Sequence, residues 1–500
     1  MVDRARLTPP RPRQENWRWH EATVAAVSVA KLSRGDRRME AASYLDPGYA
    51  TRIAITSKSS GWLELSEVAR VWQPSRLKGI QVAPEHGTPF LSATQVFAER
   101  PTARKWLAAD RTPNAEQRLI PHGTILTTCS GNVGRTTIAH SRLSGAFISH
   151  DLLRLEPRAP GWRGWIYAYL LAPSVRGLLQ AAQYGHVIKH LETSHLDGMP
   201  IIEIDGESRA SFETLFQEVL RRRDEAFDLR DQAEQLLGTA LGVERDGAKR
   251  DLVVFAASSR DLLTGRRRLD ASYYSPAARD VLASIANSKC KTESLGELCS
   301  RVWWETRFAR VFGSTGAPYM SSDELFSIDL PSVKRVKLEP IERPERFFAE
   351  AGWLLLACSG QTYGINGSVA LMTRQHEEYF FSHDLIRLAP KAGRVDPGYL
   401  FAYLGHPTIG YPLLIRLAYG SSIPHLDPAD VSSVPVARLN PSLEKEIGQI
   451  ASQSAELHQS ARELEGRMAQ SAEDILQAFI AGRTFSSFAR GALRLVQNSA

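Results

Sequence analysis

Apolar residues recur three and four positions apart in two long stretches of the chain, one after residue 204 and one after residue 439. This spacing predicts helices with one apolar face, and it continues for four or more heptads in each stretch, which is typical of a coiled coil. Asn440 followed by Pro441 predicts the start of the second helix, because the Asn side chain caps the first turn and proline needs no donor there. Two separate amphipathic surface helices are the weaker alternative. The expected contact positions between the helices are Leu215, Val219, Leu229, Leu236, Ile447, Ile450, Leu457, Leu464, Met468 and Ile475.

The two regions that precede these helices repeat one another. "FISHDLLRLEP" from Phe147 matches "FFSHDLIRLAP" from Phe380, and "GTPFLSATQVF" from Gly87 matches "GAPYMSSDELF" from Gly316. The pairs "GTILTTCSGNVG" and "GWLLLACSGQTYG", and "YGHVIKHL" and "YGSSIPHL", occur in the same order in both regions. Solenoid repeats have periods of roughly 20 to 50 residues, so this much longer repeat indicates a duplicated domain.

We therefore expect an α+β protein with two similar domains, each followed by a long helix. A helix of about 36 residues is roughly 54 Å long, so two antiparallel helices would form a spacer with one domain at each end. The domains would then be related by an approximate two-fold axis. The expected segments are a tail (1–20), domain 1 (21–204), helix 1 (205–243), domain 2 (244–439), helix 2 (440–482) and a second tail (483–500).

Composition fits a globular protein that can approach nucleic acid. Of 500 residues, 43% are hydrophobic and 23% are charged, and the formal net charge is +6. The four cysteines have no CxxC spacing, which fits a reducing compartment. The first residues are polar, and no apolar stretch reaches the roughly 18 residues of a membrane helix, so we expect a cytoplasmic protein.

The sequence contains no catalytic motif that we recognise. GxxxxGK[ST], HExxH, GxSxG and a strand-GxGxxG-helix unit are all absent, as is an NPP[YF] stretch. The His-Asp pairs at His150 and His383 could belong to metal sites, and His190 and His425 also match in the two copies, but nothing else completes a ligand set. We interpret each Ser-His-Asp as the start of a buried strand, and Cys129 and Cys358 as small core residues.

Together, the repeated blocks and the two heptad helices resemble the specificity subunit of type I restriction–modification enzymes, from about Val24 to about Ile480. The resemblance implies two target-recognition domains and a subunit that catalyses nothing and holds no cofactor. Such a subunit reads a bipartite site in double-stranded DNA and docks methyltransferase subunits, two by symmetry, which use S-adenosylmethionine. A translocating restriction subunit can join the complex. Because the loops "SGNVGR" and "SGQTYG" differ, the two half-sites should differ too.

The resemblance also implies which side chains touch DNA. Bases would be read by polar loop residues, and phosphates would be held by cations supported by serines. Alternatively, the loop glycines only shape a turn, and Arg38 and Arg267 brace their domains through carboxylates. The expected base-reading residues are Asn132, Arg135, Gln361, Tyr363 and Asn366, and the expected phosphate contacts are Arg38, Lys189, Arg267, Arg310, Ser130, Ser359 and Ser421.

Three other functions fit the same sequence. The chain could be the recognition module of another phage-defence or DNA-modification system. It could be a metal-dependent hydrolase that uses the duplicated His-Asp pairs, or a scaffold whose helices bind only protein. Salt-dependent binding to duplex DNA would argue against the scaffold.

Overall fold

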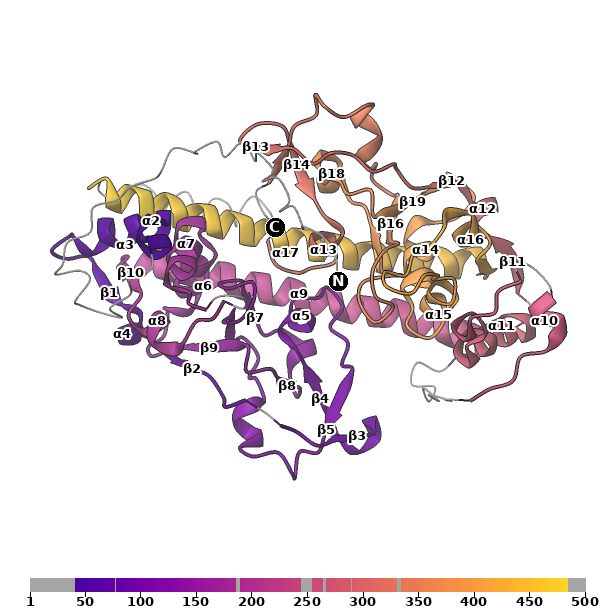
Figure 1. Ribbon diagram of the computed structural model, residues 1–500, viewed down its shortest axis with the longest axis horizontal. Coiled ribbons are helices and arrows are strands. Elements are labelled where there is room, and N and C mark those ends of the chain that lie inside the picture. The colour runs from indigo at the N-terminus through magenta and orange to yellow at the C-terminus, as the bar shows by residue number, and fades with distance from the viewer. Residues whose placement is uncertain are drawn as a thin grey trace, which may run out of the picture.

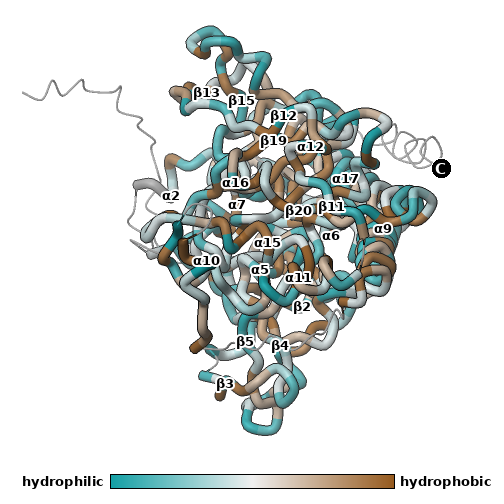
Figure 2. Tube along the Cα trace, turned by 90° about the vertical axis from the view of Figure 1, so that its right-hand side faces the viewer, coloured by the Kyte–Doolittle hydropathy of each residue, from teal (hydrophilic) through white to brown (hydrophobic). Residues whose placement is uncertain are grey.

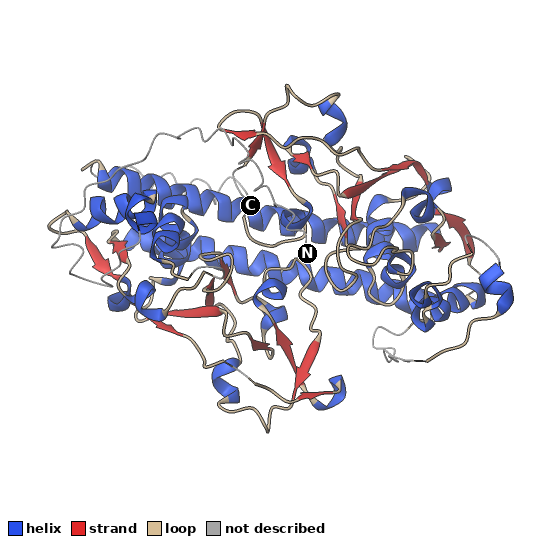
Figure 3. Ribbon diagram, viewed as in Figure 1, coloured by secondary structure: helices blue, strands red, loops and turns tan. Residues whose placement is uncertain are grey.

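Two long helices lie side by side through the middle of the molecule, and one mixed domain packs on each side of them, towards opposite ends (Figure 1). The computed structural model describes residues 41–76, 78–185, 189–243, 254–263, 267–288, 290–330 and 334–483. The mixture of helices and mostly antiparallel strands in Figure 3 confirms the mixed class expected from the sequence. Within the described residues, no helix has the length and apolar character needed to cross a membrane.

Domain 1 contains two four-stranded sheets. The inner sheet has the strand order β2-β9-β6-β7, and the outer sheet, farther from the long helices, has the order β3-β5-β4-β8. A separate pair, β1 and β10, joins the start of the domain to its end. The elements are α2 (Ala41–Leu45), α3 (Pro47–Thr56), β1 (Trp62–Glu64), α4 (Leu65–Val68), β2 (Ala69–Trp72), β3 (Gln81–Val82), β4 (Thr88–Leu91), α5 (Ala93–Val96), β5 (Lys105–Leu107), β6 (Ile125–Thr128), β7 (Thr136–Ile138), β8 (Phe147–Ile148), β9 (Leu152–Pro157), α6 (Arg163–Leu171), α7 (Pro173–Ala182), α8 (Thr193–Asp197) and β10 (Pro200–Ile202).

Domain 2 repeats this topology strand for strand. Its inner sheet has the order β12-β19-β16-β17, its outer sheet β13-β15-β14-β18, and β11 pairs with β20. The repeat in the sequence is therefore a repeat of the fold. The elements are α10 (Ser259–Leu263), α11 (Pro276–Asn287), β11 (Lys291–Ser294), α12 (Leu295–Leu298), β12 (Cys299–Trp303), β13 (Phe312–Gly313), β14 (Ala317–Met320), α13 (Ser322–Leu325), β15 (Arg335–Val336), β16 (Leu354–Ala357), β17 (Val369–Leu371), β18 (Phe380–Phe381), β19 (Leu385–Pro390), α14 (Pro397–Gly405), α15 (Gly410–Ile415), α16 (Pro428–Ser432) and β20 (Pro435–Arg438).

The long helices are α9 (Gly206–Leu241, 36 residues) and α17 (Pro441–Ile480, 40 residues). Asp205 caps α9, and Asn440 caps α17 by accepting from the Ser442 amide at 3.0 Å, as the Asn-Pro pair predicts. Pro441 occupies the first turn, where its missing N–H costs no hydrogen bond.

The two helices run in opposite directions. The Ser454 hydroxyl donates to the Ala226 carbonyl at 2.6 Å, and further along α17 Glu465 pairs with Arg223, which lies earlier in α9. Arg223 and Glu465 have side chains only 3% and 1% exposed, with 2.7 Å between nitrogen and oxygen, and Tyr167 also donates to Glu465. A shift of the helices would leave one buried charge without its partner, which costs free energy, so the ion pair favours one register of the helices.

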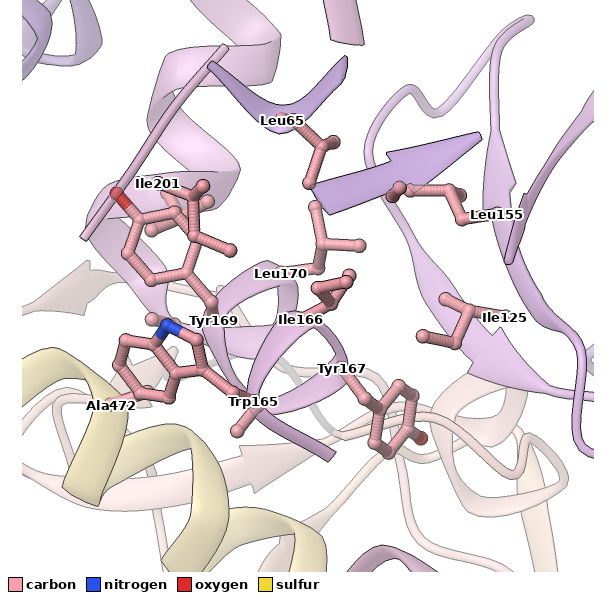
Figure 4. Packing of buried hydrophobic residues seen from close by; sticks show 14 of the residues in the cluster. Leu65, Ile125, Leu155, Trp165, Ile166, Tyr167, Tyr169, Leu170, Ile201 and Ala472 are labelled. Carbon is pink, nitrogen blue, oxygen red and sulfur yellow. The ribbon is translucent and has the colours of Figure 1, made fainter. Parts of the chain in front are cut away.

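Each long helix forms part of the core of both domains. The core of domain 1 includes residues 212–220 of α9 and 464–479 of α17, and the core of domain 2 includes 233–241 of α9 and 447–451 of α17. In Figure 4, Trp165 and Tyr169 of α6 lie beside Ala472 of α17. The two helices therefore contribute to both hydrophobic cores and are not a free spacer. Of the positions predicted for the helix contact, Leu215, Val219, Ile447, Leu464, Met468 and Ile475 are buried, whereas Leu229, Leu236, Ile450 and Leu457 are half-buried.

A glycine brings each domain into close contact with the helix that follows it. A Cβ on Gly164 in α6 would lie 2.3 Å from the Phe212 carbonyl of α9. A Cβ on Gly398 in α14 would lie 2.0 Å from the Gly448 carbonyl of α17. Both distances are far below van der Waals contact, so each position requires the absence of a side chain. Glycine therefore allows the same close helix contact at equivalent positions of the two domains.

The two domains also touch each other directly. Ala98 and Ser327, which directly follow the matched blocks that end at Phe97 and Phe326, form an antiparallel bridge. The Glu99 amide donates to the Phe326 carbonyl at 2.9 Å, and the Ile328 amide donates to the Phe97 carbonyl at 2.9 Å. These two bonds exchange under the repeat, so an approximate two-fold axis passes between Ala98 and Ser327.

Candidate nucleic-acid interface

Three repeated motifs that are distant in sequence lie together in each domain. In domain 1 the Cys129 amide donates to the Asp151 carbonyl at 2.9 Å, and the Leu191 amide donates to the Cys129 carbonyl at 2.8 Å. In domain 2 the Cys358 amide donates to Asp384 at 3.3 Å, and the Leu426 amide donates to Cys358 at 2.9 Å. We call this grouping of the Cys-Ser-Gly loop, the Ser-His-Asp turn and the Tyr-Gly…His-Leu segment the motif junction.

The Cys-Ser-Gly loop is held to the Tyr-Gly…His-Leu segment by bridges that repeat. Ser130 pairs with His190, and Ser359 pairs with His425. In domain 1 the Ser130 hydroxyl lies 3.0 Å from Nδ1 of His190, and the Lys189 carbonyl accepts from the Gly131 amide at 3.0 Å. Ser130, Ser359 and Lys189 are half-buried, so the structure places these three at the base of the loop.

The Ser-His-Asp residues lead directly into the buried strands β9 and β19, so "LLRL" and "LIRL" lie in the core as expected. The three polar residues precede each strand rather than being its first residues. Ser149 donates to Asp151 at 2.7 Å and Ser382 to Asp384 at 3.1 Å, as expected of short polar residues in turns. Each His lies beside its Asp, with 3.5 Å between the ring of His150 and the carboxylate. No group of three His, Cys, Asp or Glu suited to a metal occurs among the described residues, so the hydrolase alternative gains no support.

The Arg of "LLRL" and "LIRL" lies inside each domain and donates to backbone carbonyls. Arg154 and Arg387 are 0% exposed. Arg154 donates to the carbonyls of Ile148 at 2.7 Å and Ser149 at 3.1 Å, and Arg387 donates to Leu385 at 3.2 Å. Burial lowers the pKa of each guanidinium to about 10. In domain 1 the Ser-His-Asp turn is therefore held by its own buried cation, a role that the sequence did not reveal. In domain 2 Arg387 bonds the first residue of β19 and the Phe347 carbonyl, each at 3.2 Å.

Cys129 and Cys358 are buried in the motif junctions. Burial raises the pKa of Cys129 to about 11 and that of Cys358 to about 12. Since the thiolate is the nucleophile, both thiols are poorly suited to covalent catalysis near neutral pH, in keeping with the core interpretation.

Of the two base-reading residues predicted in the loop of domain 1, one is exposed and the other is paired with a residue of domain 2. Asn132 is exposed, with Oδ1 3.5 Å from the Arg176 guanidinium. Arg135 is instead paired with Asp329 of domain 2 through two bonds, of 2.7 and 2.8 Å. We therefore leave Arg135 out of the candidate interface.

The loop of domain 2 also divides its predicted residues. Gln361 is exposed and donates to the Ser422 carbonyl at 2.8 Å, and Tyr363 is 64% exposed with the Arg104 guanidinium 5.3 Å from its ring centre. Asn366 is 0% exposed, and its amide donates to the carbonyls of Gly360 at 2.9 Å and Pro424 at 3.0 Å. Asn366 shapes the loop, so the structure contradicts its prediction as a base-reading residue.

The predicted phosphate contacts are scattered rather than clustered. Arg310 is 39% exposed and lies 3.2 Å from the Asp384 carboxylate at the motif junction of domain 2. Arg267 is exposed, with a left-handed φ of 52°, and Ser421 is exposed beside the bridge to His425. Arg38 lies outside the described residues.

Each outer sheet also carries cations, most of which the sequence analysis did not single out. In the view of Figure 2, turned by 90° from Figure 1, the loops at the far tips of both domains are mostly hydrophilic. Exposed apolar side chains interrupt them: Ile80 (57%) in domain 1, and Val311 (42%) and Phe312 (44%) in domain 2. The interleaving of basic and aromatic residues in "RFARVF" is the sequence pattern that could have indicated the cations of domain 2. We call the exposed cations the outer rims: Arg76, Lys78, Arg104 and Lys105 in domain 1, and Arg307, Arg310, Lys334, Arg335 and Lys337 in domain 2.

No protein-family model matches the chain, and no curated protein matches it significantly. Among solved structures, the chain is similar to the type I restriction–modification S subunit from M. genitalium, with 13% identity, 84% of this chain and 96% of that chain covered, and a TM-score of 0.33. It is similar to the HsdS subunit from Thermoanaerobacter tengcongensis (15%, 85% and 98%, TM-score 0.25) and to a chain of a type I R-M system whose assembly was studied (15%, 84% and 97%, TM-score 0.24). These neighbours are of the family that the repeated motifs resemble. Because the identities and TM-scores are low, function must be inferred from the chain's own residues.

Proposed function

We propose that this chain is the DNA-specificity subunit of a type I restriction–modification complex. The observation that carries the proposal is the duplicated fold: two domains of one topology, related by an approximate two-fold axis, on an antiparallel helix pair that belongs to both cores. Duplex DNA has local two-fold symmetry as well, so a protein of this shape can place equivalent surfaces on two half-sites.

The outer rims and the exposed loops supply the two kinds of contact that DNA recognition needs. Cations on the rims would neutralise phosphates without regard to sequence. Asn132 in domain 1, and Gln361 and Tyr363 in domain 2, have the exposure that reading base edges requires. Because these loops differ between the domains, the target should be asymmetric and bipartite.

Catalysis would belong to partner subunits. A methyltransferase must enclose a flipped base and S-adenosylmethionine. The cavity lined by His458 and Arg462 in this chain has a volume of about 40 Å³, which is too small for either. The approximate two-fold axis would offer equivalent docking surfaces to two methyltransferase subunits, with a translocating restriction subunit as a further partner. The complex would act in the cytoplasm.

The test is a map of modified bases in the native host, with and without this gene. We expect one bipartite motif, two short specific halves around a fixed gap, to lose its methylation when the gene is deleted. Unchanged methylation in a host that expresses the gene would reject the proposal. It would favour a recognition module that serves a system without a methyltransferase.

A further inference from the structure

The contact between the two domains is built from more than the Ala98–Ser327 bridge. Arg135 of domain 1 donates through Nε and Nη2 to both oxygens of Asp329 and also to the Ser327 hydroxyl at 3.0 Å. Its guanidinium lies 4.1 Å from the ring centre of Phe97. Burial alone would raise the pKa of Asp329, but the hydrogen bonds and charge of Arg135 outweigh it and lower that pKa. The carboxylate is therefore ionised and firmly held.

The opposite side of the axis carries a different set of contacts between the halves. Arg100, which occupies the repeat position of Asp329, donates to the Gly405 carbonyl of domain 2 and pairs with Glu234 of α9 at 2.7 Å. Arg230 of α9 pairs with Glu99 at 3.4 Å. We call residues 97–100 and 326–329 the junction segments. Each reaches across the axis, and each is fixed by charged side chains at its far end.

We propose that the junction segments restrict binding to one length of gap between the two DNA half-sites by fixing the relative orientation of the two outer rims, with Arg135, Asp329 and Arg100 as positioning residues. This inference rests on the proposed function. The helices fix how far apart the two cores lie, whereas the junction segments fix the orientation of the two outer rims relative to one another.

The geometry of DNA makes the junction a sensitive control of the gap. One base pair more or less moves a half-site by about 3.4 Å and rotates it by roughly 35° about the DNA axis. Backbone hydrogen bonds tolerate only a few tenths of an ångström around 2.9 Å. A domain that followed such a rotation would have to break the bonds at Ala98 and Ser327, so an intact junction should reject probes with the wrong gap.

The first experiment measures, in the absence of DNA, the distance between the two outer sheets. Spin labels are placed at exposed loop positions that follow β5 and β15 of the two outer sheets, through Asp110→Cys and Glu339→Cys in the full chain, and their distance distribution is recorded. We expect Asp329→Asn, and separately Arg135→Ala, to broaden a narrow distribution. The matched control is Glu444→Gln, which weakens the two-bond pair of Arg438 and Glu444, of 2.9 and 2.8 Å, within one half. The control should leave the distribution narrow.

The second experiment measures the gap. Duplex probes carry the two half-sites found in the methylation map, with the native gap or with one base pair added or removed. We expect the parent chain with its methyltransferase subunits to prefer the native gap by about tenfold or more, and Asp329→Asn to reduce that preference to about threefold or less. The preference for each half-site sequence should remain. The exchange Arg135→Asp with Asp329→Arg should restore the preference for the native gap.

The outcomes separate the two proposals. A parent complex that binds none of the probes would reject the proposed function. A parent complex that binds with a sharp gap preference, while Asp329→Asn keeps both that preference and a narrow distance distribution, would reject the role of the junction alone.

Discussion

The two halves of the molecule share a backbone but differ in the charges at their centre. When the helices are aligned at their caps, Asp205 and Asn440, Arg223 of α9 corresponds to His458 of α17, and Arg230 corresponds to Glu465. On one side of the axis Arg223 of α9 therefore pairs with Glu465 of α17, whereas the equivalent place on the other side holds His458 of α17 and Arg230 of α9. Burial and nearby arginines, Arg230 first among them, lower the pKa of His458 to about 3, so this histidine is neutral.

This difference shows which features had to be kept after duplication. The strand order, the glycine contacts and the exchanged backbone bonds at the axis are the same in both halves. Side-chain charge was free to change wherever another group could balance it. Arg230 illustrates this, since its charge is met by Glu99 and Glu234 rather than by the opposite helix. Substitutions at the centre of the molecule can therefore affect one half without the other.

The largest expected effect is a loss of stability in mild acid. His140, His376 and His458 are buried, and burial lowers the pKa of each, to about 3 for His376 and His458. Unfolded histidines titrate near 6.5, so below that pH protons bind the unfolded chain first and the folded state loses stability. From pH 6.5 to 5 each histidine should cost about 1.7 kcal/mol, or about 5 kcal/mol together.

Urea unfolding at a series of pH values measures this loss. His458→Phe should remove about a third of it, because the ring lies against Phe227, with 4.8 Å between centroids, and needs no charge. A free energy of unfolding that stays constant between pH 6.5 and 5 would contradict the prediction.

Breaking the central ion pair should have the next largest effect. Glu465→Gln leaves the Arg223 cation buried without a counter-charge and should cost about 3–5 kcal/mol in urea unfolding. Replacing both residues, as Arg223→Met with Glu465→Leu, should recover most of that loss. Arg230→Met should cost less than Glu465→Gln, because Arg100 still pairs with Glu234 at 2.7 Å. Equal losses for Arg230→Met and Glu465→Gln would mean that the two halves do not differ at the centre.

The glycine contacts should respond equally in the two halves. Gly164→Ala and Gly398→Ala each place a methyl group against the backbone of a long helix and should cost about 1–3 kcal/mol. Gly206→Ala in α9 is the control, since a Cβ there meets nothing within 4 Å. Thermal unfolding of the three variants tests this, and a cost for Gly164→Ala alone would limit the close contact to domain 1.

The smallest effects should appear in DNA binding. Arg307→Ala in domain 2 and Arg76→Ala in domain 1 should each lower the slope of log affinity against log salt by about one, and equally for all sequences. Gln361→Ala should change base preference in one half-site only. Salt titrations with a set of duplexes distinguish the two behaviours, and a sequence-dependent effect of Arg307→Ala would make it a base-reading residue.

Local patterns in the sequence predicted the elements but not their long-range partners. Heptad spacing and the Asn440–Pro441 cap predicted α17, and the repeated blocks predicted two domains of one topology. Arg135 stands in a glycine-rich loop, where nothing nearby indicates that its partner is Asp329, 194 residues away. Asn366 has the composition of a solvent-facing loop residue, yet its amide satisfies two carbonyls inside the loop. Polar residues in such loops look alike whether they face water or the backbone, so tertiary contacts decide their role.

The pair of Arg223 and Glu465 also governs which half can associate with which. Two copies of the first half would bring Arg223 of one copy to the place where the other copy has Arg230, so the buried Arg223 would lose its carboxylate partner and face a second cation. Two copies of the second half would bring Glu465 to His458, a pair without that repulsion. One ion pair thus makes the first half dependent on the second. In a cell that produced the halves as separate chains, we expect mixed pairs and paired second halves to be more stable than paired first halves.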